Sequence, residues 1–158
     1  MAKLTEGVAN FFHRQPYTIV TTVDKKGCPH NSCKGIVDIE EDGTIYLLDL
    51  YKEKTYSNLK ENPHVNITAV DEHKFIGFCL KGKAEIANKE VLHSEIVKKW
   101  EDRITKRISQ RLLRNIQGQK GHPSHPESLF PKPEYLIKVI VEEIIDLTPH
   151  HIKKNSIK

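Results

Sequence analysis

Lys54 and Thr55 are the residues whose type and position most clearly indicate chemistry. They come where a predicted strand ends and the segment 53–62 begins a predicted short helix. A helix N-terminus presents unpaired N–H groups and the positive end of the helix dipole, and both favour a phosphate group. The ammonium group of Lys54 adds a positive charge, and the hydroxyl of Thr55 adds a donor. These features indicate a phosphate-binding site, with an ordinary surface helix as the alternative.

The cysteines and histidines are weaker candidates. Cys28 and Cys33 are five positions apart, and such a pair alone is not typical of a metal or redox site, so we expect buried, unreactive thiols. Four histidines have the chemistry of transition-metal ligands: His122, His125, His150 and His151. Because histidines flanked by Gly and Pro in a loop usually face solvent, we predict no metal site.

The composition is that of one globular domain. The chain has 158 residues, of which 37% are hydrophobic and 29% charged, enough to bury a core without disulfides or a metal. We assign residues 1–149 to this domain and 150–158 to a polar tail. The sequence has no run long enough for a transmembrane helix and no apolar signal core at its start. With three Cys, an odd number, it fits a reducing compartment, and we predict a cytoplasmic protein.

Alternating and β-branched runs predict a mainly β, antiparallel fold. Thr5 is a plausible cap for a helix over 3–14, and Gly27 and Gly43 suit hairpin turns between the first three strands. Because no crossover helices separate these strands, the pattern favours a small β-barrel with peripheral helices over a parallel doubly wound sheet. The predicted strands are 17–23, 29–40, 44–50, 64–70, 75–87 and 135–147, with helices at 53–62 and from Asn88 onwards.

Three segments, in this order, resemble the pyridoxamine 5′-phosphate oxidase-like family, the FMN-binding split barrels. Residues 27–35 begin Gly-Cys-Pro-His, which is similar to the family's entry into its second strand. Residues 54–63, with Lys-Thr, Asn-Leu and Asn-Pro, resemble its phosphate-binding segment and the helix behind it. Residues 77–85 resemble its long strand before a helix. The resemblance covers residues 17–87, and 135–147 fits the closing strand.

The resemblance implies a six-stranded antiparallel split β-barrel that binds FMN at a homodimer interface, where the second subunit completes the pocket. It implies that Lys54 and Thr55 hold the FMN phosphate. An exposed strand edge would supply N–H donors to the flavin, and Lys34 would place a positive charge near the pyrimidine end or, alternatively, be a solvated strand residue. The edge of the isoalloxazine ring is placed along Asn31, Ser32, Cys33, Lys34, Gly35 and Ile36.

Two departures from the family's pattern argue against pyridoxamine-phosphate oxidase activity itself. The oxidases end in a motif with Arg and His that holds the pyridoxal substrate, whereas residues 136–143 contain no Arg and 147–149 are a short echo of their Leu-x-Pro end. The oxidases tend to have Ser-Arg-Lys where residues 53–55 are Glu-Lys-Thr. Residues 98–133, a helical and loop insert before the last strand, lie outside the resemblance.

Positive charge gathers in this insert. The chain has 25 Lys and Arg against 21 Asp and Glu, a net charge of +4. Residues 98–120 carry +6 and the rest of the chain −2, because only Glu101 and Asp102 oppose eight basic residues there. The eight are Lys98, Lys99, Arg103, Lys106, Arg107, Arg111, Arg114 and Lys120.

Three interpretations of the basic insert stay open. It is a solvated helix face, or it overhangs the flavin pocket and attracts an anionic substrate or the phosphates of a nicotinamide cofactor. The third is a nucleic-acid surface, which we do not expect, because Trp100 is the only aromatic ring in the segment and single strands stack on rings. Trp100 shares an apolar stripe with Ile96 and Ile104, which predicts a place in the core.

We therefore predict an FMN-dependent oxidoreductase that acts on an unidentified small substrate, with a nicotinamide donor as one possible partner. The alternatives are a non-catalytic FMN-binding redox carrier, and a barrel that binds the deazaflavin F420 or another anion. No side chain stands out as a general acid or base, so the catalytic residues are unknown.

Overall fold

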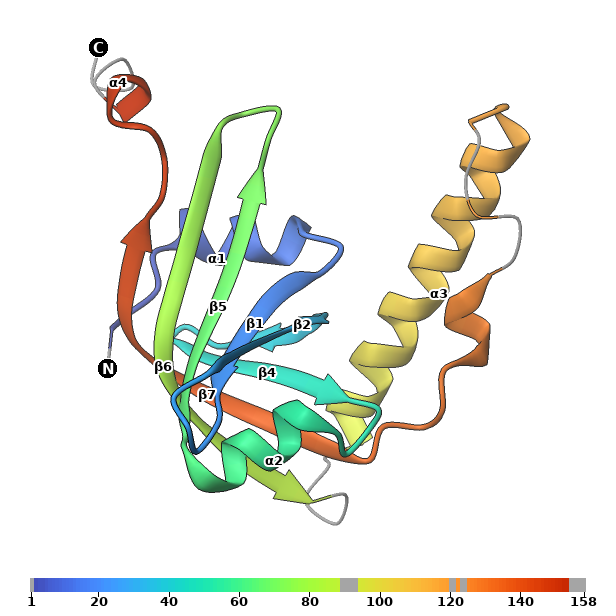
Figure 1. Ribbon diagram of the computed structural model, residues 1–158. Helices are drawn as coiled ribbons and strands as arrows, with labels where there is room; N and C mark the ends of the chain where they lie inside the picture. The colour runs from blue at the N-terminus through green and yellow to red at the C-terminus, as the bar shows by residue number, and fades with distance from the viewer. Residues whose placement is uncertain (1, 89–93, 120–121, 123–124, 154–158) are drawn as a thin grey trace.

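The computed structural model describes residues 2–88, 94–119, 122 and 125–153 (Figure 1). The predicted helix start at 89–93, Lys120 of the basic segment and residues 154–158 of the tail lie outside the described residues. The strands are β1 (Thr18–Val23), β2 (Pro29–Lys34), β3 (Ile36–Ile39), β4 (Thr44–Asp49), β5 (His64–Asp71), β6 (Ile76–Asn88) and β7 (Tyr135–Asp146). The helices are α1 (Glu6–Arg14), α2 (Lys54–Glu61), α3 (Ser94–Ile116), the 3₁₀ helix η2 (Pro126–Leu129) and α4 (His150–Lys153).

All seven strands form one antiparallel sheet in the order β2-β1-β5-β6-β7-β4-β3. The chain passes from one edge strand, β2, to the other, β3, through Gly35 alone. The sheet must therefore curl until its two edges approach each other, and Figure 1 shows this curled, half-open barrel. The predicted split barrel is confirmed. Its strand count is seven rather than six, because the predicted strand 29–40 leaves one edge and enters the other at this glycine.

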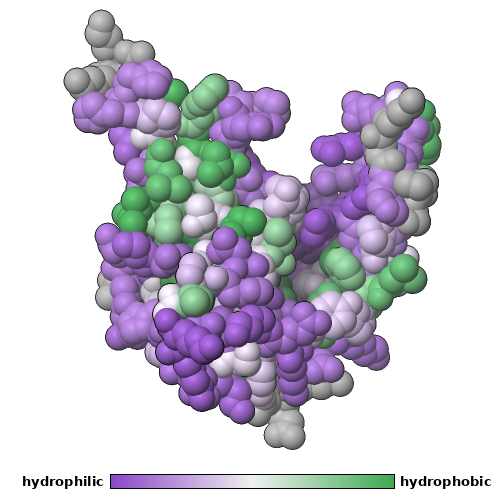
Figure 2. Space-filling model, in the orientation of Figure 1, coloured by the Kyte–Doolittle hydropathy of each residue, from purple (hydrophilic) through white to green (hydrophobic). Residues whose placement is uncertain are grey.

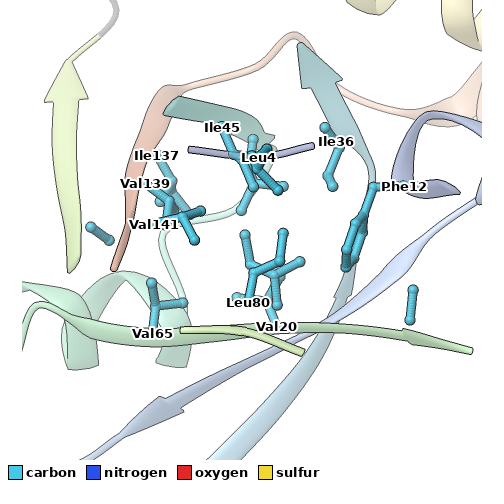
Figure 3. Close-up of a cluster of buried hydrophobic side chains, with 14 of the residues drawn as sticks. Leu4, Phe12, Val20, Ile36, Ile45, Val65, Leu80, Ile137, Val139 and Val141 are labelled. Carbon is cyan, nitrogen blue, oxygen red and sulfur yellow. The ribbon is translucent and has the colours of Figure 1, made fainter. Parts of the chain in front are cut away.

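One large hydrophobic core fills the barrel (Figure 3). Its buried members come from six of the seven strands, and α1 adds Phe12 while α2 adds Leu59. Each fully buried aliphatic or aromatic side chain contributes roughly 1.5–3 kcal/mol to folding. No residue of β2 belongs to the buried core, since this strand has only exposed and half-buried positions. The fold can therefore form without committing the side chains of β2 to packing.

Helix α3 lies on the outer face of the barrel. Ile96 and Trp100 pack there on a small cluster from β3, β4 and β7, made by Val37, Leu48 and Leu136. This confirms that Trp100 packs against apolar residues, but α3 has no fully buried residue. The predicted cap residue Asn88 is the last residue of β6, and the predicted helix start that follows it lies outside the described residues. None of the described helices is long and apolar enough to cross a membrane.

Local signals outside α3 place the ends of the elements. The hydroxyl of Thr5 accepts a hydrogen bond from the N–H of Val8 and caps α1 as predicted. Gly27 and Gly43 have φ angles of 80° and 92°, in the left-handed region that favours glycine, at the two predicted hairpin turns. In the C-terminal tail, residues 150–153 form the short helix α4.

Gly82 lies at a bulge where the backbones of β6 and β7 approach each other closely. The register between the two strands shifts between Lys81 and Gly82, which marks a bulge. A Cβ atom at position 82 would lie 2.1 Å from the carbonyl oxygen of Ile140. The close approach of two backbones therefore requires glycine here.

We expect Gly82→Ala to lower the free energy of unfolding by at least about 2 kcal/mol, because overpacking costs about 1–3 kcal/mol even where side chains can move, and here the obstacle is backbone. Urea denaturation measures the change. Gly7→Ala in α1 is the control, since no atom lies within 4 Å of the added Cβ. That control should be stabilising by about 0.5–1 kcal/mol. Equal stability of Gly82→Ala and the wild type would contradict the bulge argument.

Candidate functional site

A pocket of about 410 Å³ opens where the barrel is split. Its floor comes from β2, Gly35 and the end of β4, and its walls come from the start of α2 and the N-terminal half of α3. Apolar and aromatic side chains form much of the lining: Tyr17, Val37, Leu48, Leu50, Tyr51, Trp100, Ile104 and Phe130. Its size and its mixture of rings and polar groups are those of a site for a small organic ligand.

Two hydroxyl groups meet at the α2 end of the pocket. The Oγ atom of Ser32 on β2 lies 3.0 Å from the Oγ1 atom of Thr55 on α2. No side chain caps the N-terminus of α2, where Glu53 is the N-cap residue. Lys54 extends from the same turn, half exposed, with its Nζ atom 3.7 Å from a carboxylate oxygen of Asp24. The hydroxyls, the uncapped helix end and Lys54 are donor groups of the kind that phosphate groups favour.

The structure brings six of the eight sequence-predicted site residues to this pocket: Ser32, Cys33, Lys34, Gly35, Lys54 and Thr55. The other two lie elsewhere. Asn31 is exposed, and its side chain accepts a hydrogen bond of 2.7 Å from the hydroxyl of Thr21. Ile36 is fully buried in the barrel core. The backbone edge of β2 stays available, since β1 is the only strand that pairs with β2 in the described chain.

Lys34 lines the pocket, but its side chain is held in a buried ion pair. Its ammonium group donates to the carboxylate of Asp49 on β4, and both side chains are 9% exposed. The hydroxyl of Tyr135 on β7 donates to the same carboxylate. Burial, and then this hydrogen bond, raise the pKa of Tyr135 well above its usual range. Lys34 is thus neither a solvated residue nor a free positive charge, because Asp49 neutralises it.

The basic insert contributes directly to the pocket. Arg103 and Arg107 of α3 line it beside Trp100. The guanidinium group of Arg103 donates to the carbonyl of Gln15 at 2.6 Å, and its Nε atom lies 3.9 Å from the position of a Cβ on Gly35. Of the sequence-based alternatives, the geometry therefore favours the overhanging insert over a wholly solvated face.

The prediction of buried thiols at Cys28 and Cys33 is wrong, because both are exposed. Cys33 lies on β2, an edge strand outside the core whose side chains are not enclosed by a second neighbouring strand. Cys28 lies before β2, in the hairpin turn between β1 and β2. No group of three or more His, Cys, Asp or Glu within the described residues could hold a metal ion.

Sequence reasoning missed several lining residues, among them Asp49, His30 and Phe130. Asp49 had a signal, since it is an acidic residue at the end of an otherwise apolar strand. No comparable signal marks Phe130, which reaches the pocket from the long connection after α3.

Because the Lys34–Asp49 pair is buried, we expect Asp49→Asn to lower the free energy of unfolding by about 3 kcal/mol, leaving the Lys34 charge without a counter-charge. The double variant Lys34→Met/Asp49→Asn should recover part of this loss. Glu143→Gln is the matched control. Glu143 pairs with Lys81 at 3.2 Å on the surface, where both side chains are about half exposed, so the control should cost less than about 1 kcal/mol. Equal losses of unfolding free energy in Asp49→Asn and Glu143→Gln would contradict a special need for a counter-charge at the buried Lys34.

Comparison with known proteins agrees with this fold. HupZ of Group A Streptococcus is 23% identical, with a TM-score of 0.65 over 92% of this chain and 94% of HupZ. An F420 reductase is 17% identical, with a TM-score of 0.56 over 90% of this chain and 98% of its own. HutZ, the haem storage protein of Vibrio cholerae, is 16% identical, with a TM-score of 0.53 over 91% of this chain and 94% of HutZ.

At these low identities, the similar structures establish a shared fold alone. No curated protein matches the chain. The model of the pyridoxamine 5′-phosphate oxidase family, however, matches residues 4–132. Since this match covers most of its length, the chain belongs to the pyridoxamine 5′-phosphate oxidase family.

Proposed function

We propose that this protein binds FMN in the pocket between β2, α2 and α3 and acts as a flavin oxidoreductase. One observation carries the proposal: the hydroxyls of Ser32 and Thr55 meet 3.0 Å apart at the uncapped N-terminus of α2, at one end of a pocket lined by rings. Membership of the pyridoxamine 5′-phosphate oxidase family supports a flavin ligand. The fold alone leaves the choice open, since similar structures include an F420 reductase and a haem storage protein.

The residues present fit the two ends of FMN. Ser32, Thr55 and the first N–H groups of α2 would bind the phosphate, and Lys54 would add its charge. The unpaired edge of β2 would donate to the polar edge of the flavin ring, and the apolar lining would pack on the ring's face. Bound FMN supplies the redox chemistry, accepting or giving up two electrons. The protein's own contribution is to position the ring and to limit its contact with water.

The sequence predicted a positive charge of Lys34 near the flavin ring, but Asp49 neutralises this charge. Because the two side chains form a buried pair, they add little net charge to the pocket that they line. Positive charge in the pocket comes instead from Lys54 and from Arg103 and Arg107 on α3. A negatively charged reduced flavin would therefore be stabilised by groups at the rim of the pocket rather than by Lys34.

The proposal includes a homodimer. Val70 and Leu147 lie next to each other around Gly77, and they are 61% and 45% exposed. Phe75, on the hairpin between β5 and β6, is 62% exposed. Figure 2 shows apolar side chains gathered on the upper part of the barrel, above a hydrophilic lower part. An apolar surface of this kind is typical of protein association.

Sedimentation velocity tests this dimer. The wild type should sediment as a dimer, and Val70→Asp should shift it towards the monomer, because a charge would be buried at the interface. Ile116→Asp at the end of α3 is the control for an exposed apolar residue, since Ile116 is 73% exposed. A monomeric wild type, or dissociation caused by the control alone, would be incompatible with this interface.

FMN affinity tests the phosphate site. Trp100 is the only tryptophan of the chain and lines the pocket, so its fluorescence reports on binding. We expect Lys54→Ala together with Thr55→Ala to weaken FMN binding by at least about tenfold, because charge-assisted hydrogen bonds are worth roughly 1.5–3 kcal/mol each. Lys60→Ala, at the other end of α2, removes the same charge and should leave FMN affinity unchanged.

Haem is the second candidate, because His30 lines the same pocket and is a possible axial ligand. Titration with haemin tests it on the same protein. Our proposal predicts tight binding of FMN and no change in the haemin spectrum that depends on His30. A haemin complex that is lost in His30→Ala, combined with no FMN binding, would favour haem and exclude the flavin site.

A further inference from the structure

A second hollow, of about 980 Å³, runs along α3 beside the flavin pocket. It lies between α3 and the C-terminal end of α1, where Figure 2 shows a notch with hydrophilic walls. Val37, Arg103 and Arg107 line both hollows, so the groove continues from the pocket. The proposed FMN site uses the pocket alone, and the groove remains free for a second ligand.

The groove is strongly basic, and its acidic residues neutralise only part of the charge. Seven Lys and Arg side chains line it, against two acidic ones. Arg111 is paired with Glu127, and Lys99 is paired with Asp38. Arg107 forms no hydrogen bond or ion pair within the described residues. A net positive charge is therefore left where the groove meets the pocket.

Arg103 and Arg107 concentrate this charge at the junction. Both are half-buried, and they lie one helical turn apart on α3. Arg103 donates to the neutral carbonyl of Gln15 and has no carboxylate partner in the part of the chain that the structure describes. Burial, and then the charge of Arg107, lower the pKa of Arg103, yet a guanidinium group stays protonated at ordinary pH. Neither arginine forms a direct ion pair within the described residues, although Arg107 lies near enough to Glu127 to lower the pKa of its carboxyl group. The two positive charges therefore favour an anion that accepts hydrogen bonds from both.

Building on the proposed FMN site, we propose that the groove binds the electron donor, a reduced nicotinamide dinucleotide, with its pyrophosphate between Arg103 and Arg107. The nicotinamide end would enter the pocket beside Trp100, and the adenosine end would lie in the groove. A hydride leaving nicotinamide C4 with its electron pair would be transferred to bound FMN, so that the dinucleotide would be oxidised and the flavin reduced by the same two electrons.

Size and charge favour a dinucleotide over a small anionic substrate. A small anion would need only the place between Arg103 and Arg107 where the two hollows meet. The second hollow extends beyond this place along α3, and its volume of about 980 Å³ is larger than the 410 Å³ of the pocket. Lys106 and Arg114 line this extension without ion pairs in the described chain. They would attract the 2′-phosphate that a reduced nicotinamide dinucleotide phosphate carries at its adenosine end.

Calorimetric binding of NAD⁺ and NADP⁺ to the FMN-loaded protein tests the inference without any turnover. We expect Arg107→Gln to weaken the tighter of the two by at least about tenfold, since charge-assisted hydrogen bonds to a phosphate are lost. Lys98→Gln is the matched control, because Lys98 is exposed on the same helix and lines neither hollow.

The outcomes separate this inference from the proposed function. Absence of FMN binding in the wild type would overturn both. Normal FMN binding with equal dinucleotide affinity in wild type and Arg107→Gln would overturn the donor site alone. If Arg107→Gln weakens FMN more than riboflavin, which lacks the phosphate, the arginines hold the flavin phosphate and the donor site is wrong.

Discussion

The buried ion pair between Lys34 and Asp49 joins two parts of the sheet that no strand pairing connects. Lys34 ends the edge strand β2, and Asp49 ends β4, next to the opposite edge strand. Gly35 carries the chain across the gap in a single step, which forces the sheet to curl. The hydroxyl of Tyr135 adds β7 to the same carboxylate. A closed barrel would have hydrogen-bonded strands here, and this protein has a side-chain network.

The candidate site lies at the gap between β2 and β4, where no strand pairing closes the barrel; we call this gap the open seam. Because β2 contributes nothing to the buried core, its backbone edge and the hydroxyl of Ser32 remain available beside the N-terminus of α2. The basic helix α3 then lies over the seam and adds Trp100, Arg103 and Arg107. The barrel supplies a rigid frame for a phosphate and a ring, and the insert supplies the charge that would select a second ligand. Affinity and substrate preference can therefore change through α3 while the barrel core stays the same.

The sequence predicts the local features of this structure well, because these depend on neighbouring residues. β-branched runs identify the strands, Gly27 and Gly43 mark turns that need positive φ, and a helix start is predicted where α2 begins at Lys54. The break at Gly35 is hidden, because residues on both sides of it favour strands and the change of edge is a property of the whole sheet. The burial of Lys34 could not be predicted from the sequence either, because its counter-charge, Asp49, lies on β4, which does not pair with β2.

The central claim is that a flavin mononucleotide binds at this seam. Native mass spectrometry of the purified protein, combined with its visible spectrum after addition of FMN, tests the claim most directly. We predict a complex with the mass of FMN in each subunit and the absorption bands of a bound oxidised flavin. A protein that carries haem or another molecule, and that takes up no FMN when FMN is added in excess, would contradict the account.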